Sequence, residues 1–245
     1  MPGILVTGST EGLGRHTAET LLDQGHHVVV HARTPARLAA VRDLLDRGAQ
    51  AVVGDLGDLA QVRDVAQQAN ALGPFEAVIH NAGVLGGDAV LPVNVVAPYE
   101  LTAAMERPGR LVYLSSGMHH GGRAELAGVD WSGTRRSRSY SDSKLYVTVL
   151  MAAVARLWPD VPVHAVDPGW VPTRMGGPGA PDDLREGHLT QVWLATADDP
   201  QILVSGRYWH HRRPREPHRA VHDENFQDTL LASLAAHTGS RIAPG

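Results

Sequence analysis

A tyrosine and a lysine stand four residues apart in the stretch Tyr140-Ser141-Asp142-Ser143-Lys144. On a helix this spacing places both side chains on the same face. An ammonium group beside a phenol stabilises the phenolate, so we expect Lys144 to lower the pKa of Tyr140 from ~10 towards neutrality. Tyr140 could then give a proton to a carbonyl oxygen or take one from an alcohol. Lys144 is also the only lysine of the chain.

A glycine-rich segment follows the first apolar run of the chain. The run Gly3–Thr7 leads into Gly8-Ser9-Thr10-Glu11-Gly12-Leu13-Gly14, where a helical pattern begins. Glycines at such a turn let the backbone come close to a pyrophosphate at the N-terminus of the helix. The spacing is Gly-x-x-x-Gly-x-Gly, not the commoner Gly-x-Gly-x-x-Gly, but its place after the first strand still predicts dinucleotide binding.

The end of the second apolar run, His31-Ala32-Arg33-Thr34, bears on the choice of dinucleotide. It has no acidic residue that could accept a hydrogen bond from a ribose 2′-hydroxyl, whereas Arg33 can pair with a 2′-phosphate through a charge-assisted hydrogen bond. A solvated surface arginine is the alternative interpretation of Arg33, and Glu11 counts slightly against a 2′-phosphate. The balance predicts NADP(H), with NAD(H) as the less favoured cofactor.

Short apolar runs alternate with helical patterns along the whole chain. This alternation predicts an α/β fold in which a parallel sheet carries helices on both faces. Right-handed crossovers make it a doubly wound, Rossmann-like fold. The strands are expected at Gly3–Thr7, His27–Ala32, Gln50–Val53, Ala77–His80, Gly109–Leu114, Val163–Val166 and Ser205–Trp209. The helices are expected at Gly12–Gln24, Pro35–Arg47, Asp58–Ala71, Val93–Glu106, Ser139–Trp158, Asp182–Ala197 and Asp223–His237.

We expect a single domain over residues 1–245, because no linker, repeat or low-complexity tract interrupts this alternation. Two regions depart from it. Residues Gly117–Arg138 are polar and have no clear period, which favours a loop. The glycine and proline cluster at Gly176–Pro181 indicates a turn and places a possible substrate lid at residues 174–200.

Composition excludes several other classes of protein. The chain contains no cysteine, so disulfides, thiolate metal sites and a cysteine nucleophile are excluded. A net charge of −4 gives no electrostatic reason to expect a nucleic acid or an anionic membrane as partner. The sequence shows no signal peptide and no membrane-spanning segment, so we expect a cytoplasmic protein. No metal is expected, because arginines surround the histidines His210, His211, His218 and His222.

Motifs spread along nearly the whole chain together resemble the short-chain dehydrogenase/reductase family. In order they are Thr7–Gly14, Asp55-Leu56, Asn81-Ala82-Gly83, Asn94, Ser115-Ser116, Tyr140-x-x-x-Lys144, and Pro168-Gly169 with Thr173. Each motif is weak by itself, but their shared order is specific. The segments Ser115–His120 and Ser205–Trp209 look most like the retinol-dehydrogenase-like branch.

The resemblance implies a role for each matching residue. Tyr140 is the implied acid and base, and Lys144 tunes it and binds the nicotinamide ribose. Asn94 is implied to hold a water molecule that passes protons to solvent. Ser116 is the implied hydrogen-bond donor to the substrate oxygen, with Ser115 as its competitor. The expected cofactor-binding residues are Gly8, Thr10, Gly12, Leu13, Gly14, Arg33, Asp55, Leu56, Asn81, Ala82, Gly83, Tyr140, Lys144, Pro168, Gly169, Val171 and Thr173.

These features predict an NADP(H)-dependent oxidoreductase that transfers a hydride between the nicotinamide and a carbonyl or alcohol. The alternative is a catalytically idle NADP-binding regulator, which the complete set of four catalytic residues disfavours. We expect a bulky apolar substrate, and the branch resemblance suggests retinoid-like or lipid aldehydes. The residues expected near the substrate are Met118, His119, Trp131, Trp170 and Met175.

The spacing between Ser116 and Tyr140 bears on the oligomeric state. The two residues are 24 positions apart, which is longer than in most tetrameric members of the family. The extra loop could obstruct the helix face through which those tetramers assemble. We therefore expect a monomer or a homodimer.

Overall fold

The computed structural model describes residues 3–245 and contains one eight-stranded sheet. The strands lie in the order β3-β2-β1-β4-β5-β6-β7-β8, in which β1 to β7 are parallel and β8 runs antiparallel to β7. The strand bounds are β1 Gly3–Val6, β2 Val28–Ala32, β3 Gln50–Val53, β4 Phe75–His80, β5 Leu111–Leu114, β6 Val163–Asp167, β7 Arg207–His210 and β8 Arg213–Arg215. The expected doubly wound α/β fold is confirmed, and its strand order reverses between β1 and β4.

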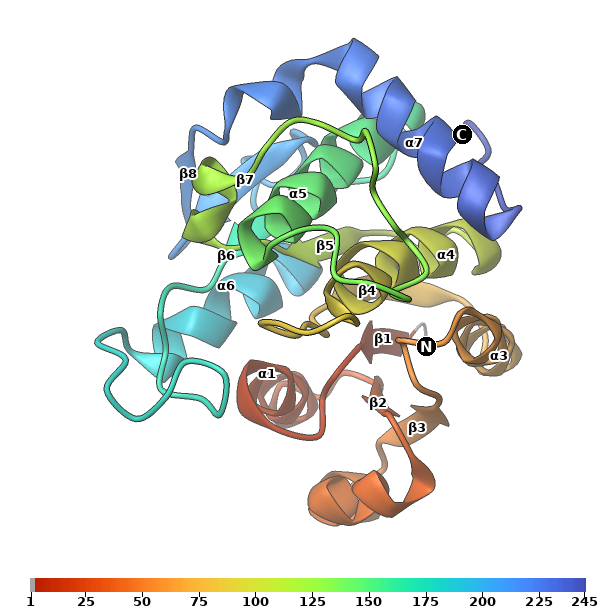
Figure 1. Ribbon diagram of the computed structural model, residues 1–245. Helices are drawn as coiled ribbons and strands as arrows, with labels where there is room; N and C mark the ends of the chain where they lie inside the picture. Colours follow the sequence, from red (N-terminus) through yellow and green to blue (C-terminus); the bar gives the residue numbers. More distant parts are fainter. Residues whose placement is uncertain (1–2) are drawn as a thin grey trace.

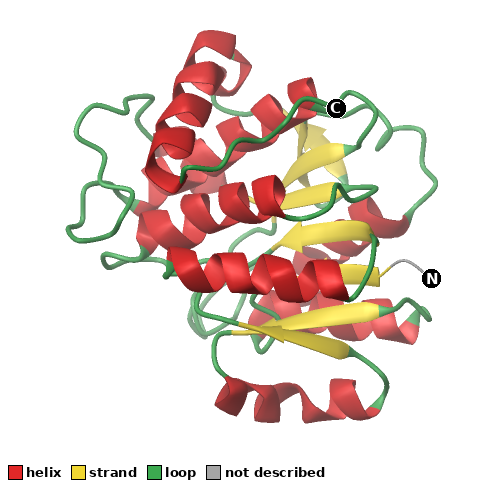
Figure 2. Ribbon diagram, turned by 90° about the vertical axis from the view of Figure 1, so that its right-hand side faces the viewer, coloured by secondary structure: helices red, strands yellow, loops and turns green. Residues whose placement is uncertain are grey.

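Helices cover both faces of this sheet (Figures 1 and 2). Their bounds are α1 Gly12–Asp23, α2 Arg42–Asp46, α3 Leu59–Ala71, α4 Ala97–Ala104, α5 Tyr140–Leu157, α6 Leu184–Thr196 and α7 Glu224–Thr238. In β1, Leu5 packs into the core below α3, α4, α5 and α7, whereas Ile4 and Val6 pack against α1, α2 and α6. Burial on both faces explains why the strands are almost unbroken apolar runs.

Three elements differ from the sequence prediction. The helix expected over residues 35–47 is a 3₁₀ turn, Pro35–Val41, followed by the short α2. The helix expected from Val93 opens with a π turn, Pro92–Val96, which continues into α4. Strand β8 was not expected. The turn that produces it, His211-Arg212, has positive φ angles of 48° and 59° but lacks the Asn-Gly pair that usually signals such a hairpin.

The parallel arrangement gathers the expected site residues at one edge of the sheet. Gly8 follows β1, Arg33 follows β2, Asp55 follows β3, Asn81 follows β4 and Ser116 follows β5. Each of these positions lies at the carboxyl end of its strand. Ligands of doubly wound folds bind at this edge, where the strand order reverses.

Buried histidines make the stability of this fold depend on pH, and three of them have strongly lowered pKa values. Burial lowers the pKa of His80 to about 3 and the pKa of His119 and His164 to about 4. In the unfolded chain these side chains titrate near ~6.5. Below that pH the unfolded state binds more protons than the folded state, so the free energy of unfolding falls as the pH falls.

We therefore expect the free energy of unfolding in urea to decrease between about pH 7 and pH 5. Each of the three histidines contributes up to about 1.4 kcal/mol per pH unit. The variant His80→Gln should show a shallower dependence, whereas His27→Gln, at an exposed position, should keep the wild-type slope. An unfolding free energy that stays constant over this range contradicts the assignment of neutral buried imidazoles.

Candidate active site

The loop between β1 and α1 forms a glycine-lined cradle. Gly8 and Gly12 have positive φ angles of 63° and 57°, which side chains disfavour. A Cβ atom at Gly8 would lie 2.9 Å from the Cα atom of Ala82. Glu11 places no side-chain cap on α1, so the first amides of the helix can bind an anion. The Leu13 side chain packs against the core. The loop fits a dinucleotide pyrophosphate.

His31 holds this cradle in place, a role that sequence reasoning missed. The Gly8 amide donates to Nδ1 of His31 at 3.0 Å. The ring proton is therefore on Nε2, which donates to the Gly54 carbonyl at 2.9 Å. Burial lowers the pKa of His31, so the ring stays neutral and keeps both hydrogen bonds. The ends of β1 and β3 are thereby joined across β2.

Two arginines flank the same loop. Arg37 donates to the Thr10 hydroxyl at 3.2 Å and pairs with Glu11 at 3.0 Å. The acidic side chain that counted against a 2′-phosphate is thus neutralised by a neighbour. Arg33 is exposed beyond β2, and within residues 3–245 its guanidinium makes no hydrogen bond or ion pair. Its donors are directed to solvent beside the cradle.

The ends of β3 and β4 complete the expected dinucleotide side of the site. The Asp55 carboxylate accepts a nearby main-chain amide at 2.9 Å, and Leu56 is buried beside it. Asn81 donates to the Thr7 carbonyl at 2.8 Å, and the Ala82 amide donates to the Thr7 hydroxyl at 3.0 Å. These bonds join β1 to β4 at the point where the sheet order reverses.

Asn94 lies in the π turn before α4, and such turns are frequent at functional sites. Its Oδ1 accepts the Val84 amide at 2.8 Å, and its Nδ2 donates to the Ser143 hydroxyl at 2.9 Å. A Cβ atom at Gly83 would lie 3.4 Å from Asn94 Oδ1 and 3.5 Å from Lys144 Nζ. Both polar atoms border the space beside Gly83, which can hold a water molecule or a ribose hydroxyl.

Tyr140, Lys144 and Ser116 come together at the carboxyl end of β5. The Ser116 side chain is close enough to the Tyr140 phenol to lower its pKa, and Lys144 Nζ lies 5.6 Å from the centre of the Tyr140 ring. Lys144 is only 4% exposed and donates to the Leu114 carbonyl at 2.7 Å. Ser115 is buried, and its hydroxyl bonds to a threonine of α5 at 2.6 Å. Ser116 is therefore the serine that faces Tyr140.

The pKa of Tyr140 moves in the direction opposite to the sequence expectation. Burial raises the pKa of Tyr140 to about 12; the neighbouring Ser116 side chain opposes this rise and the charge of Asp167 adds to it. Burial also lowers the pKa of Lys144 to about 8, although Asp167 opposes this shift. The expected lowering of the tyrosine pKa is wrong for this structure, because burial of the phenol outweighs any attraction to the ammonium. Tyr140 is thus a neutral phenol that can donate its proton.

The start of α5 fixes the position of Tyr140. The Asp142 amide donates to the Ser139 hydroxyl at 3.1 Å, and the Ser139 amide donates to the Asp142 carboxylate at 2.9 Å. This reciprocal capping box satisfies two amides that the helix itself leaves without partners. Arg123, from the long loop, pairs with Asp142 at 3.2 Å. The helix consequently begins at Tyr140, and Lys144 follows one turn later.

The segment after β6 lies against the glycine-rich loop. It carries the expected residues Pro168, Gly169, Val171 and Thr173. A Cβ atom at Gly12 would lie 3.4 Å from a methyl carbon of Thr173, and Val171 is buried. The second half of the expected lid at 174–200 is α6, which packs into the core. Residues 174–183 remain as the irregular part of that segment.

Three of the five residues expected near the substrate are exposed beside the catalytic group. Met118 follows Ser116 on the turn after β5, and Trp170 and Met175 lie on the segment after β6. Large apolar side chains are rarely exposed together without a function. All three lie on segments that follow strands at the carboxyl edge of the sheet.

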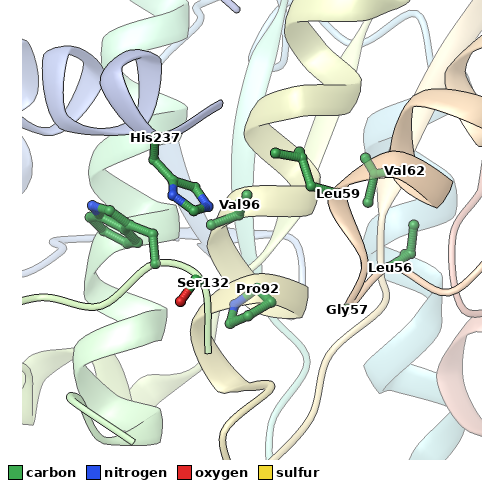
Figure 3. Close-up of a pocket in the computed structure, with 9 residues that line it drawn as sticks. Leu56, Gly57, Leu59, Val62, Pro92, Val96, Ser132 and His237 are labelled. Atoms are coloured by element: carbon green, nitrogen blue, oxygen red, sulfur yellow. The ribbon is translucent and has the colours of Figure 1, made fainter. Parts of the chain in front are cut away.

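The other two residues have structural roles, so their expected place near the substrate is wrong. His119 is fully buried; its Nε2 accepts the His218 amide at 3.0 Å, and its Nδ1 therefore donates to the Ser116 carbonyl at 2.8 Å. Trp131 is also buried and donates to Ser233 of α7 at 2.8 Å. It lines a cavity of about 140 Å³ between α3, the π turn and α7 (Figure 3), which none of the four catalytic residues borders.

The histidines near the C-terminus form pairs. His210 stacks on His211 with ring centres 3.9 Å apart, and His222 contacts Glu216 at 2.7 Å. Among residues 3–245, no group of three or more metal-ligating side chains is placed to hold a metal ion.

In the same part of the chain, no helix is both long and apolar enough to cross a membrane.

The single lysine allows a direct test of the site. An amine-directed acylating reagent can modify only Lys144 and the N-terminal amine. Because Lys144 is buried, we expect slow acylation in the free protein, and much slower acylation once NADP occupies the adjoining space. Mass spectrometry of the intact protein and of one peptide measures both rates, with the N-terminal amine as internal control. Equal rates at Lys144 with and without NADP place this residue outside the cofactor site.

Comparisons with known proteins agree with this geometry. A family model described as short chain dehydrogenase matches residues 3–183. The chain is 36% identical over 256 residues to the short-chain dehydrogenase chyC of Penicillium rubens, with 99% of each chain covered. It is 28% identical over 280 residues to a polyprenol dehydrogenase of Danio rerio, and the alignment covers 96% of this chain and 86% of the relative.

Solved structures share the fold. An uncharacterised protein from Mycobacterium paratuberculosis superposes with a TM-score of 0.81 at 24% identity, covering 99% of this chain and 95% of the other. The complex of RhlG from Pseudomonas aeruginosa with NADP superposes with a TM-score of 0.66 at 21% identity, covering 85% of this chain and 94% of RhlG. The similarity therefore extends over most of the sheet and its helices.

Proposed function

The chain belongs to the short-chain dehydrogenase family and is an oxidoreductase, and from this premise we propose that it reduces carbonyl compounds with NADPH. The observation that carries the proposal is the convergence of Tyr140, Ser116 and Lys144 at the carboxyl edge of the sheet, where Lys144 Nζ lies 5.6 Å from the centre of the Tyr140 ring. A phenol with a pKa of about 12 remains protonated at neutral pH. The site therefore holds a proton donor beside a hydroxyl that can bind an oxygen atom.

Each catalytic residue has a defined task in this proposal. Bound NADPH supplies the hydride. Ser116 donates a hydrogen bond to the carbonyl oxygen and orients it, and Tyr140 gives that oxygen a proton as negative charge develops on it. Lys144 bonds the ribose and stabilises the phenolate that Tyr140 becomes. Asn94 and Lys144 border the space through which a water molecule can return the proton.

The preference for NADPH rests on the charges next to Thr10. Arg33 has unengaged donors beside the cradle, and Arg37 already reaches the Thr10 hydroxyl. The end of β2 has alanine at position 32, where an acidic residue would favour the ribose 2′-hydroxyl of NADH. RhlG, which shares the fold, is itself known in complex with NADP.

The substrate class and the oligomeric state extend the proposal. The exposed rim of Met118, Trp170 and Met175 suits a bulky apolar molecule, and one relative is a polyprenol dehydrogenase. Residues 174–183 are the segment that would close over it. The long loop and α7 lie beside α5 (Figure 1), and Trp131 joins the loop to α7. This cover favours a monomer over assembly through α4 and α5.

The decisive experiment measures NADPH oxidation at 340 nm with a panel of aldehydes and ketones, including long-chain and polycyclic ones. Turnover of at least one class supports the reductase. Tight NADPH binding without turnover across the panel supports the alternative, an idle NADP-binding regulator. Size-exclusion chromatography with light scattering decides between monomer and homodimer.

A further inference from the structure

A single carboxylate, that of Asp167, lies at the end of β6 beside the catalytic group. One of its oxygens accepts the Gly169 amide at 3.0 Å, and the other lies 3.5 Å from Nδ1 of His210. Burial and the nearby charge of Asp167 raise the pKa of the Tyr208 hydroxyl. The Asp167 side chain is only 15% exposed. The Gly169 amide and His210 position the carboxylate, although sequence reasoning assigned it no role.

The charge of Asp167 is weakly compensated. Among residues 3–245, no lysine or arginine forms an ion pair with it, and its one partner of this kind is His210, which is charged only when protonated. Burying a carboxylate without a cationic partner costs free energy. Such a group is a candidate for a functional role, since a structural role could be filled by a neutral side chain.

The same charge reaches the reacting groups. A Cβ atom at Gly117, the residue after Ser116, would lie 3.1 Å from Oδ2 of Asp167. The Asp167 carboxylate raises the pKa of both Tyr140 and Lys144, against the effect of burial in the case of Lys144. The electric field of Asp167 therefore extends to the position beside Ser116 and Tyr140 where the substrate carbonyl is proposed to lie.

We propose that Asp167 is a specificity-determining residue, whose fixed negative charge makes the site select neutral or cationic carbonyl compounds and reject anionic ones. The proposal rests on the carbonyl reductase function proposed above. A carboxylate or phosphate on the substrate is repelled at short range, because the buried site screens charge less than water does. Neutral or cationic groups at the same position suffer no such repulsion.

Apart from Lys144, whose ammonium form the charge of Asp167 favours, three other titratable groups around the site do not cancel this charge. His119, on the turn after β5, is held neutral by its two hydrogen bonds, and burial lowers its pKa to about 4. Burial raises the pKa of Tyr208, on β7, so it is neutral as well. Asp182 adds a second negative charge further out, where it accepts the Trp170 amide. His210 adds a positive charge only when it is protonated.

The first test measures how the charge of Asp167 affects the reactivity of Lys144, and it needs neither substrate nor cofactor. Asp167→Asn keeps the shape of the side chain, and Asp198→Asn removes the same charge from an exposed position beyond α6. Removing the negative charge lowers the pKa of Lys144, so we expect acylation of Lys144 near neutral pH to be about threefold faster, or more, in Asp167→Asn. Asp198→Asn should match the wild type. An unchanged pH dependence of Lys144 acylation in Asp167→Asn overturns the proposal.

The second test compares substrates that differ in charge. With NADPH, kcat/KM is measured for para-carboxybenzaldehyde and para-nitrobenzaldehyde in the wild type, Asp167→Asn and Asp167→Glu. We expect the ratio of carboxylated to neutral substrate to rise about tenfold or more in Asp167→Asn and to stay low in Asp167→Glu. Equal losses for both substrates show a structural role only and overturn the assignment. If the wild type reduces no carbonyl, the proposed function fails, and the labelling test still decides the charge of Asp167.

Discussion

Replacing Tyr140 with phenylalanine is expected to lower kcat for carbonyl reduction by ~10²–10⁴-fold, because the substitution removes the proton donor and keeps the ring. The high pKa of the Tyr140 hydroxyl keeps it protonated at neutral pH. Affinity for NADPH should stay nearly unchanged. Steady-state and single-turnover kinetics with a substrate from the aldehyde panel measure the loss, with NADPH fluorescence for binding.

A second tyrosine on the same helix provides the control. Tyr146 is buried on α5 and donates to a carbonyl of the long loop, so Tyr146→Phe removes a hydroxyl of equal size away from the proposed reaction. We expect this variant to lose some stability and to keep most of its kcat. The assignment of Tyr140 is excluded if Tyr140→Phe retains more than about a tenth of the wild-type kcat while chemistry limits the rate in both.

Replacing Arg33 with aspartate is expected to weaken NADPH binding about tenfold or more at modest salt. A charge-assisted hydrogen bond contributes ~1.5–3 kcal/mol, and the new carboxylate repels the 2′-phosphate. NADH should bind equally well or better, because an aspartate can accept a hydrogen bond from the ribose 2′-hydroxyl. Fluorescence titration of both cofactors gives the ratio of affinities, which is the informative quantity.

Arg37→Asp is the matched comparison for Arg33. Arg37 is already paired with Glu11, so we expect its loss to change the ratio of NADPH to NADH affinity less than the loss of Arg33. Raising the salt concentration should reduce the effect of Arg33→Asp, since the site is exposed and its charges are screened. A ratio that is the same in Arg33→Asp and the wild type shows that Arg33 is merely solvated, and Arg37 then becomes the candidate.

Local signals in the sequence were enough to predict the doubly wound fold of this protein. Unbroken apolar strands alternating with helices require a sheet buried on both faces, and seven of its eight strands were expected close to their observed positions. The positions of the glycine-rich loop, Asn81, Ser116 and Tyr140 followed, because parallel strands bring their carboxyl ends to one edge. Strand β8 was missed, because the bend at His211-Arg212 has no characteristic turn residues and the Arg212 amide bonds instead to Thr190 of α6.

The sequence by itself determined where the strands and helices lie along the chain, how the motifs are spaced and which residue types stand at the edge of the sheet. The tertiary structure alone decided the ionisation of these residues and their partners. Burial, which no spacing reveals, raises the pKa of Tyr140 and reverses the expected direction. His31 and His119 bond across distant parts of the chain, and the carboxylate of Asp167 reaches the catalytic group from β6. Charge and desolvation depend on distances in space, and only the folded chain sets those distances.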